Sequence, residues 1–570
     1  MTTYQQPLIA VTTSESLNNF YSVKIYDAAT NTVINTTTVS SNGKNLTLRP
    51  TNALANGSYR LKALVNRFDG TQGQASAEWK VQIGPFDTNF ANSGAVGANA
   101  HIGKVTVQST ALANVASFEC TIQAKPGTYS APVKITWSKN ALTNRNLFSS
   151  GKVDLPVYGL YANYSNTISI KATLNDNTVV NLSPVTIVTP VGPSTPFDAM
   201  TVINSKASTG RQLGYDFFLS RGTRWSPIVL DTDGNVRWAY TYADGQVFGG
   251  PFIPESSAWY DNGFLVGGRD SLGMARIQLD GSFSYTATNG FASKNITNFH
   301  HNMEKGKTGY LALQDTSTDG YESDVIEFNP DTGAVIKSWD LKQILTNHIT
   351  SNGDTVKQFF SAHDWFHVNS VAYDPYDNGL VVSSRENFVI KLDYDTGAIR
   401  WIFGDPGKYW YTDFPSLRAK ALTLSAGGIY PLGQHAVSVP EAGKLLLFNN
   451  RTTSVNQPVG SESNGQTSLV SYYSIGNDNR SATEVWQFDH PLKVSASFCS
   501  SAYMASDKSM LVMYTGRYFV QSPAPGKRFT GLDANRNIVF DYTFSDTGQG
   551  PCTESFNATP IDFGNLNFTR

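Results

Sequence analysis

One structural unit repeats six times between residue 197 and the C-terminus, and this repeat constrains the fold more than any other feature of the chain. Each copy consists of a strand, a tight polar turn and a second strand that carries an aromatic residue. Several turns hold Asp-Gly or Thr-Gly, in which glycine adopts a positive φ at little cost. The copies begin at Ile228, Ala275, Asp324, Phe388, Ser471 and Phe529.

A second apolar strand precedes most copies, as in NGFLVGG at 262–268 and KSMLVMYT at 508–515. Two hairpins per repeat make a four-stranded sheet. Repeated sheets of this kind are typical of a radial arrangement in which each sheet is one blade. Residues 197–570 are therefore predicted to form a six-bladed β-propeller.

Two smaller β units are predicted ahead of the propeller, so the whole chain is expected to be all-β. Residues 1–86 and 100–190 alternate apolar and polar positions between turn residues, which is typical of immunoglobulin-like or fibronectin-like β-sandwiches. The polar run at 87–99 is predicted to be a linker, and a Pro/Gly/Ser/Thr cluster at 189–196 marks the next boundary. The one helix expected lies at 339–347.

Composition excludes some function classes. Charged residues make up 15% of the 570-residue chain, against about 25% in ordinary soluble domains, and the net charge is −2. This gives no basic surface for nucleic acid or an anionic membrane. No apolar run approaches the roughly 20 residues of a membrane span. No signal peptide is visible at the N-terminus. Three hypotheses account for this: a leader that has been removed, another export route, or a virion component.

Three cysteines are too few for a disulfide framework. Cys499 and Cys552 can pair late in the chain, but two buried thiols are an equally good interpretation. Cys120 stands apart from both.

Three of the eight histidines fall in register with the repeat. His301 and His435 are each followed by seven residues, Gly, one residue, Leu, one residue and Leu, and His367 opens the same unit with a longer turn. The three are therefore predicted to occupy equivalent places beside the innermost strands, facing the central channel. Asn369 lies two residues beyond His367 and shares its face of the strand, and Arg385 ends the neighbouring strand.

A single histidine of this kind more often ties blades together than takes part in catalysis, but three in register with Arg385 and Asn369 favour a functional site. Neutral imidazole is a nucleophile, and Arg and further His side chains stabilise the oxygens of a transferred phosphoryl or sulfuryl group. A three-His zinc site is the rival hypothesis, weakened by the arginine. No G-x-x-x-x-G-K-[ST] loop occurs for nucleotide phosphates.

The remaining histidines carry weaker hypotheses. His300 and His363 lie beside the set and are expected to support it. His101, His348 and His490 have no matching context.

At these residues the sequence resembles the bacterial arylsulfate sulfotransferases. The resemblance covers roughly 100–570. It rests on the following segments: WFHVNSVAYDPYDNGLVVSSR (365–385), VIKLDYDTGAIRWIFGD (389–405), GQHAVSV (433–439), DVIEFNPDTGAVIKSWDL (324–341) and LPVYGLYANYSNTISI (155–170). It implies a six-bladed propeller that moves sulfuryl groups from aryl sulfates to phenols by a ping-pong route. No nucleotide sulfate donor and no cofactor or metal are implied.

Carried over position by position, the resemblance implies a role for each candidate residue. His435 becomes the nucleophile that is sulfated. His367 and Arg385 hold the sulfuryl oxygens, and Asn369 assists them. His301 serves as an oxyanion donor or as acid/base at the phenol oxygen, with His300 in its place if the alignment is one residue off.

The sequence departs from the family pattern in two ways, and these departures motivate an alternative function. Family members carry a disulfide between the arginine blade and the nucleophile blade, yet no Cys lies between Gly404 and His435. Family members are also exported, which implies a periplasmic or extracellular location. The extra 1–86 unit fits a surface or virion adhesin whose propeller binds anionic or sulfated ligands without turnover. Two further hypotheses are that the protein forms homo-oligomers and that residues 1–86 join it to a larger surface or virion assembly.

Overall fold

The protein was analysed as a computed structural model. It describes residues 6–55, 57–83, 90–149, 151–198, 200–222, 227–240, 253–269, 274–285, 291, 296–316, 323–356, 364–458, 466–516, 526–544, 552 and 555–570.

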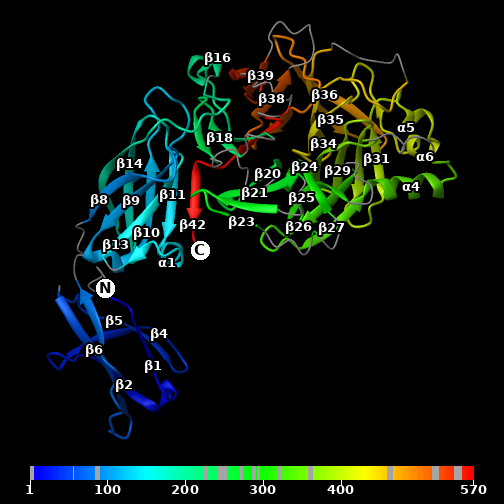
Figure 1. The fold of residues 1–570 in the computed structure, drawn as a ribbon. Coiled ribbons are helices and arrows are strands. Elements are labelled where there is room, and N and C mark those ends of the chain that lie inside the picture. The colour runs from blue at the N-terminus through cyan, green and yellow to red at the C-terminus, as the bar shows by residue number, and fades with distance from the viewer. Residues whose placement is uncertain are drawn as a thin grey trace.

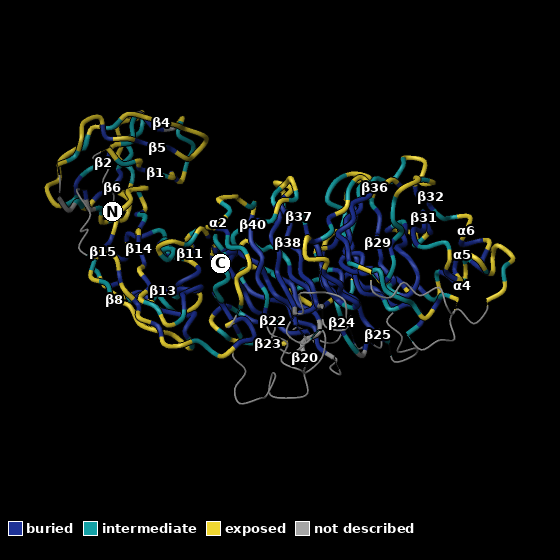
Figure 2. Tube along the Cα trace, turned by 90° about the horizontal axis from the view of Figure 1, so that it is seen from above, coloured by how far each residue is buried: buried dark blue, intermediate teal, exposed yellow. Residues whose placement is uncertain are grey.

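The chain forms three β units that follow one another along the length of the molecule (Figure 1). The third unit is the largest, and its strands are the most deeply buried part of the protein, whereas exposed positions gather on the first two units and on the outer loops (Figure 2). No helix in the described part of the chain is both long enough and apolar enough to cross a membrane.

The first unit is a sandwich of two sheets. Its core consists of apolar residues at alternate strand positions, such as Leu46 and Leu48, packed against Ile25 and Leu61. One sheet contains β3 (Thr32–Ile34), β2 (Phe20–Asp27), β6 (Gly57–Arg67) and β7 (Trp79–Ile83), and the other contains β1 (Ile9–Thr12), β5 (Asn45–Pro50) and β4 (Thr36–Asn42).

The second unit is also a two-sheet sandwich. One sheet contains β15 (Val179–Val188), β14 (Ser165–Leu174), β10 (Val115–Ile122), β11 (Val133–Ser138) and β42 (Asn565–Phe568), and the other contains β12 (Phe148–Ser149), β13 (Lys152–Tyr158), β9 (Ile102–Gln108) and β8 (Ala91–Val96). The prediction of a linker at 87–99 is wrong for β8, which pairs with β9. Sequence pattern missed β8 because it is a mostly exposed edge strand and needs no apolar alternation.

The third unit contains six sheets of four or five strands in the part that the structure describes. In spatial order these are β41 (Asn557–Ile561), β17 (Phe217–Arg221), β18 (Ile228–Asp231) and β19 (Val236–Ala239); β20 (Ile253–Tyr260), β21 (Gly263–Arg269), β22 (Met274–Gln278) and β23 (Phe283–Tyr285); β24 (Ile296–Lys305), β25 (Tyr310–Thr316), β26 (Asp324–Phe328) and β27 (Val335–Asp340); β28 (Val368–Asp374), β29 (Gly379–Ser384), β30 (Val389–Asp393) and β31 (Ile399–Phe403); β33 (His435–Ser438), β34 (Lys444–Asn449), β35 (Leu469–Ile475), β36 (Ser481–Asp489) and β32 (Thr423–Leu424); and β37 (Ser501–Met504), β38 (Met510–Gly516), β39 (Gly526–Leu532), β40 (Ile538–Phe544) and β16 (Thr201–Asn204).

The six repeated hairpins of the sequence coincide with six strand pairs of these sheets: β18–β19, β22–β23, β26–β27, β30–β31, β35–β36 and β39–β40. The preceding apolar strands are β21, β25, β29, β34 and β38. Each is buried on both faces, because side chains on alternate faces pack against different neighbouring sheets: Val381 of β29 faces one core and Leu380 another.

Neighbouring sheets touch in a cyclic order, through their first strands in five contacts and through the second strand β17 in the sixth. β20 contacts β24, β24 contacts β28, β28 contacts β33, β33 contacts β37, β37 contacts β41, and β17 contacts β20. The two ends of the unit interleave, because the late strand β41 pairs with the early strand β17 and the early strand β16 pairs with the late strand β40.

The C-terminus fastens the third unit to the second. β42 follows β41 in the chain and pairs in parallel with β11 of the second unit, where both lie side by side (Figure 1). Phe568 of β42 stacks on Trp137 with ring centroids 4.0 Å apart and planes 9° apart.

Helices are few and short apart from α4 (Leu341–Ser351), which lies where the sequence predicts a helix. Asp340 caps it by accepting a hydrogen bond from the Gln343 backbone N–H at 2.8 Å. The others described are α1 (Lys139–Asn144), α2 (Lys206–Thr209), α5 (Tyr409–Thr412) and α6 (Pro415–Arg418), with 3₁₀ turns at Leu17–Asn19 and Thr110–Asn114.

Replacing Phe568 by Ala should lower the free energy of unfolding by about 3 kcal/mol, because it removes a buried ring that stacks on Trp137. Denaturant-induced unfolding measures the loss, and hydrogen exchange should rise in β42 and β11. Phe68→Ala, at a ring that is 72% exposed, is the control and should change stability by no more than about 0.5 kcal/mol. Equal effects of the two substitutions would contradict the docking role of β42.

Candidate functional site

The three histidines predicted to face one another come from three consecutive sheets. His301 lies within β24, His367 immediately precedes β28 and His435 begins β33. Because β24 contacts β28 and β28 contacts β33, the fold brings together residues more than a hundred positions apart. The register is approximate: the left-handed backbone occurs at His301 (φ 52°) and His367 (φ 51°), but at Ala436 (φ 52°) in the third sheet, one residue beyond His435.

His301, His367, Arg385 and His435 form one cluster. The His301 and His367 rings meet edge to face, with centroids 4.9 Å apart. The Arg385 backbone N–H donates to the His367 carbonyl at 3.1 Å, which ties the end of β29 to the start of β28. The charges of Arg385 and His367 both act on the His435 ring.

Asn369 takes a different place from the one expected. Its Nδ2 donates to the Gln434 carbonyl at 2.7 Å, and its Oδ1 accepts from Ser370 Oγ at 3.3 Å. The side chain is buried and holds the chain just ahead of His435. Asn369 therefore contributes to the site by fixing the backbone of the neighbouring sheet.

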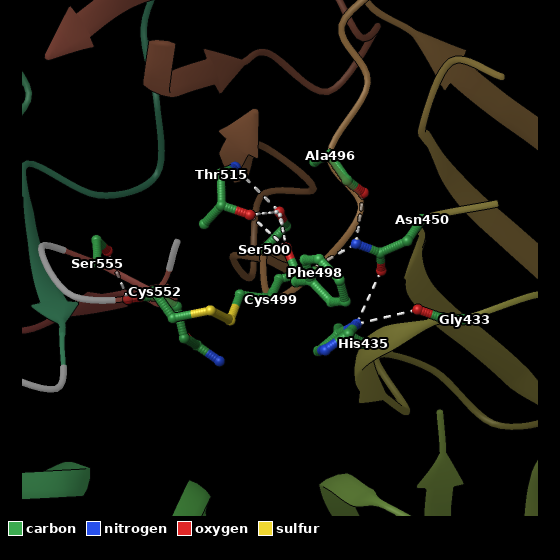
Figure 3. Close-up of a disulfide and its surroundings, with 11 residues drawn as sticks. Gly433, His435, Asn450, Ala496, Phe498, Cys499, Ser500, Thr515, Cys552 and Ser555 are labelled. Atoms are coloured by element: carbon green, nitrogen blue, oxygen red, sulfur yellow. Dashed lines mark hydrogen bonds between the residues drawn. A yellow bond between two sulfur atoms is a disulfide. The ribbon is translucent and has the colours of Figure 1, made fainter. Parts of the chain in front are cut away.

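The position of the proton on His435 follows from its hydrogen bonds (Figure 3). Asn450 Nδ2 donates to the carbonyls of Ala496 and Cys499, at 2.8 and 3.1 Å, so its Oδ1 must face His435. His435 Nδ1 lies 2.8 Å from that oxygen and 3.1 Å from the Gly433 carbonyl. Two acceptors at Nδ1 require a proton there, which leaves the lone pair on Nε2.

The His435 ring is kept neutral. Burial, followed by the positive charge of Arg385, lowers the pKa of His435 to about 3, and the hydrogen bond to Asn450 offsets only part of this shift. At neutral pH the buried Nε2 is therefore an unprotonated nitrogen beside a guanidinium group.

A disulfide stands behind this hydrogen-bond network. Cys499 and Cys552 are bonded, with Cα atoms 6.3 Å apart, which resolves the pairing that the sequence left open. The bond joins the segment before β37 to the segment before β41 (Figure 3). Cys499 accepts from Asn450 through its carbonyl, and the adjacent Phe498 ring lies 4.8 Å from the Arg385 guanidinium carbon. Cys120 is a buried free thiol.

The segment between Gly404 and His435 has no cysteine and is held by backbone pairing. Leu422 N–H donates to the Ile402 carbonyl at 2.8 Å, and Thr423 N–H donates to the Arg480 carbonyl at 2.9 Å. The short strand β32 thereby extends the sheet of the nucleophile candidate. These backbone pairs hold a segment that the sequence analysis expected to be anchored without a disulfide.

Two of the histidines have a partner behind the ring: the sequence analysis expected His300 to support the set, but it missed Asp364. Asp364 Oδ2 lies 2.5 Å from His367 Nδ1, and His300 Nδ1 lies 2.9 Å from His301 Nδ1. Asn450 was missed as well, although a signal existed: Asp315, Arg385 and Asn450 all stand at the end of the second strand of their sheets.

The other histidines lie in different surroundings. His101, His348 and His490 contact Leu160, Ser416 and Arg528 respectively. His363 falls outside the described residues. Within the described part of the chain, no three His, Cys, Asp or Glu side chains are grouped closely enough to hold a metal ion.

Two family models match the chain. The family model "Arylsulfotransferase (ASST)" matches residues 198–547, more than half of the chain, and the model "Arylsulfotransferase Ig-like domain" matches residues 105–190. The chain belongs to the arylsulfotransferase family.

Two curated arylsulfate sulfotransferases match shorter stretches of the chain than the family model does. Arylsulfate sulfotransferase AssT of Escherichia coli O6:H1 is 29% identical over 138 residues, which are 21% of this chain and 23% of that protein. Its namesake from Lelliottia amnigena is 26% identical over 176 residues, 28% of this chain and 29% of that protein. The chain thus spans less than a third of the length of these relatives. A solved WD40 domain from Toxoplasma gondii coronin aligns with 52% of this chain, over 70% of its own length and at 8% identity. Its TM-score of 0.27 is too low to show a shared fold.

Replacing Arg385 by Met should raise the pKa of His435 above its value of about 3, because the guanidinium charge disfavours a second cation. The pKa should stay below 6.5, because the ring remains buried. Imidazole ¹⁵N shifts measured against pH report this value, with His435→Gln to assign the signal. Arg418→Met, on the separate helix α6, is the matched control and should leave the titration unchanged. A wild-type His435 that titrates near 6.5 would contradict the proposed neutral environment.

Proposed function

We propose that this protein transfers a sulfuryl group from an aryl sulfate ester to a phenol, with Nε2 of His435 as the nucleophile. The observation that carries the proposal is the fixed proton at Nδ1, which leaves Nε2 as a lone-pair nitrogen in a buried ring. Membership in the arylsulfotransferase family supports the same group transfer.

We further propose that the six sheets are the blades of a six-bladed propeller. The cyclic contacts of their first strands and the pairing of β41 with β17 support closure of the ring. In this arrangement the histidine cluster lies where three blades meet at the centre.

In the first half-reaction, Nε2 of His435 forms a bond to sulfur while the bond from sulfur to the aryl oxygen breaks. The electron pair of that bond leaves with the phenolate, whose conjugate acid has a pKa of about 10. The imidazole gains positive charge as it is sulfated. The Asn450 oxygen and the Gly433 carbonyl at Nδ1 stabilise that charge, because both are hydrogen-bond acceptors.

The oxygens of the transferred group carry negative charge in the transition state. Arg385 and His367 are the two groups whose positive charges lower the pKa of His435. They are placed to stabilise these oxygens. Asp364, 2.5 Å from His367 Nδ1, fixes that ring so that its Nε2 is the nitrogen available to the substrate.

In the second half-reaction an acceptor phenol takes the group from His435. Its oxygen bonds to sulfur, the bond from sulfur to Nε2 breaks, and the electron pair returns to Nε2. The phenol proton passes to His301. Donor and acceptor use the same pocket in turn, which predicts ping-pong kinetics.

We propose a periplasmic or extracellular location. The Cys499–Cys552 disulfide supports it, since such bonds persist in oxidising compartments.

Wild-type protein should release 4-nitrophenol from 4-nitrophenyl sulfate in the presence of phenol, and His435→Ala should lower kcat at least about a thousandfold because the nucleophile is removed. Absorbance of nitrophenolate follows the reaction. His348→Ala, at a histidine on α4, is the control and should keep full activity. If the wild type binds aryl sulfates but shows no turnover with any of a range of phenols, the protein is a binding protein and the proposed activity is wrong.

Mass spectrometry without acceptor tests the intermediate separately. An acid-labile addition of one SO₃ should appear on the peptide that contains His435 and be absent from His435→Ala. Turnover without this addition would argue for direct transfer between the two phenols.

Asn450→Ala should lower kcat by about tenfold to a hundredfold with little change in KM, because His435 then loses the acceptor that keeps the proton on Nδ1. Steady-state kinetics with 4-nitrophenyl sulfate and phenol measure both constants. Asn347→Ala, on the exposed side of α4, is the matched control. A loss confined to KM would show that Asn450 serves substrate binding instead.

A further inference from the structure

Two consecutive histidines contact each other through their rings. Side chains of neighbouring residues on a regular strand point to opposite faces of the sheet, so His300 and His301 would normally be separated. β24 is interrupted between the pairs His300–Leu313 and Met303–Ala312, and His301 has a φ of 52°. This irregularity turns the His301 ring back, so that its Nδ1 lies 2.9 Å from Nδ1 of His300.

A carboxylate stands on the far side of His300. Asp315 Oδ1 lies 3.7 Å from His300 Nε2, within the range of an ion pair. The other Asp315 oxygen, Oδ2, accepts from Asn298 Nδ2 at 3.2 Å, which orients the carboxylate. His300 and Asp315 are both buried. The order of groups from the interior outward is therefore Asp315, His300, His301.

The short contact between the two Nδ1 atoms holds a single proton when both rings are neutral. If His301 donates, its Nε2 is bare and can accept a proton, while His300 carries its proton on Nε2, toward Asp315. If His300 donates, the His301 proton sits on Nε2 and His300 presents a lone pair to a carboxylate. In the second arrangement the lone pair of His300 Nε2 faces the negative charge of Asp315, which is unfavourable. Asp315 therefore favours the first arrangement, in which His301 donates.

We propose that His300 and Asp315 are positioning residues that keep Nε2 of His301 unprotonated and stabilise the charge it gains when it takes the proton of the acceptor phenol. This deepens the proposed function and rests on it. In the second half-reaction the acceptor O–H proton moves to His301 Nε2. His301 is then cationic, with its Nδ1–H donated to His300 and the Asp315 carboxylate beyond.

The groups facing this pair come from several elements. Asp364, Arg385 and His435 lie on the side of His367, whose ring is 4.9 Å from that of His301. On the other side of the pair, the Asp315 carboxylate lies 3.7 Å from His300 Nε2, and His300 Nδ1 lies 2.9 Å from His301 Nδ1. The hydrogen bond between the two rings therefore links His301 to the carboxylate.

The two half-reactions separate this role from a structural one. Release of 4-nitrophenolate needs no proton, so in single-turnover mixing His300→Gln and Asp315→Asn should form the sulfated enzyme at the wild-type rate. Transfer from that intermediate to phenol should slow by about tenfold to a hundredfold, within the range of acid–base catalysis. Transfer to pentafluorophenol, which is ionised without help, should change little. The pH dependence of transfer to phenol should shift in both variants.

The outcomes distinguish this proposal from the proposed function. Wild-type enzyme that releases no nitrophenolate overturns both. A working wild type with unchanged phenol transfer in His300→Gln overturns only the positioning role. Equal slowing of both half-reactions also overturns it, because damage to the fold affects both. His348→Gln is the matched control and should leave both rates unchanged.

Discussion

The pairing of β41 with β17 is the contact on which the third unit depends. It joins Asn557–Ile561 to Phe217–Arg221, across more than 330 residues of chain. The entropic cost of closing so long a loop grows only with the logarithm of its length. It is offset because the apolar side chains of neighbouring sheets pack into shared cores, such as the one that Leu380 enters and the one that Val381 enters. β16 adds to the same closure from the other end of the chain, on β40.

The first strands of neighbouring sheets contact one another, and the backbone is irregular where several of them begin. His301, His367 and Ala436 all adopt a left-handed conformation that non-glycine residues rarely take, as do Cys499 and Ser500 ahead of β37. Such residues cost about 1–3 kcal/mol each and persist only where the surrounding structure holds them. Here the long, doubly buried second strands provide that support. The regular second strands thus support first strands whose beginnings are irregular, and the histidines lie at or near these irregular positions.

The chemistry of the cluster depends on acceptors behind the rings. Asn450 faces His435, Asp364 faces His367, and His300 faces His301. Asn450 fixes the proton of His435 at Nδ1, and in the proposed mechanism Asp364 and His300 do the same for their neighbours, which leaves Nε2 of each ring for the substrate. The Asn450 amide is itself oriented by the Cys499 carbonyl, which links the disulfide to the nucleophile candidate. The three histidines are therefore set by three different kinds of partner.

The sequence alone determined the repeated hairpins, their strand order and the histidines beside them, because strand alternation and turn chemistry are local properties of the chain. It also placed helix α4. It could not reveal β8, because an exposed edge strand lacks the apolar pattern. Only the tertiary structure decided which groups face the histidines, since Asp315, Asn450 and Cys499 reach them across sheets or across an irregular strand. It also decided the proton position on His435, because this depends on acceptors brought together by folding rather than on spacing along the chain.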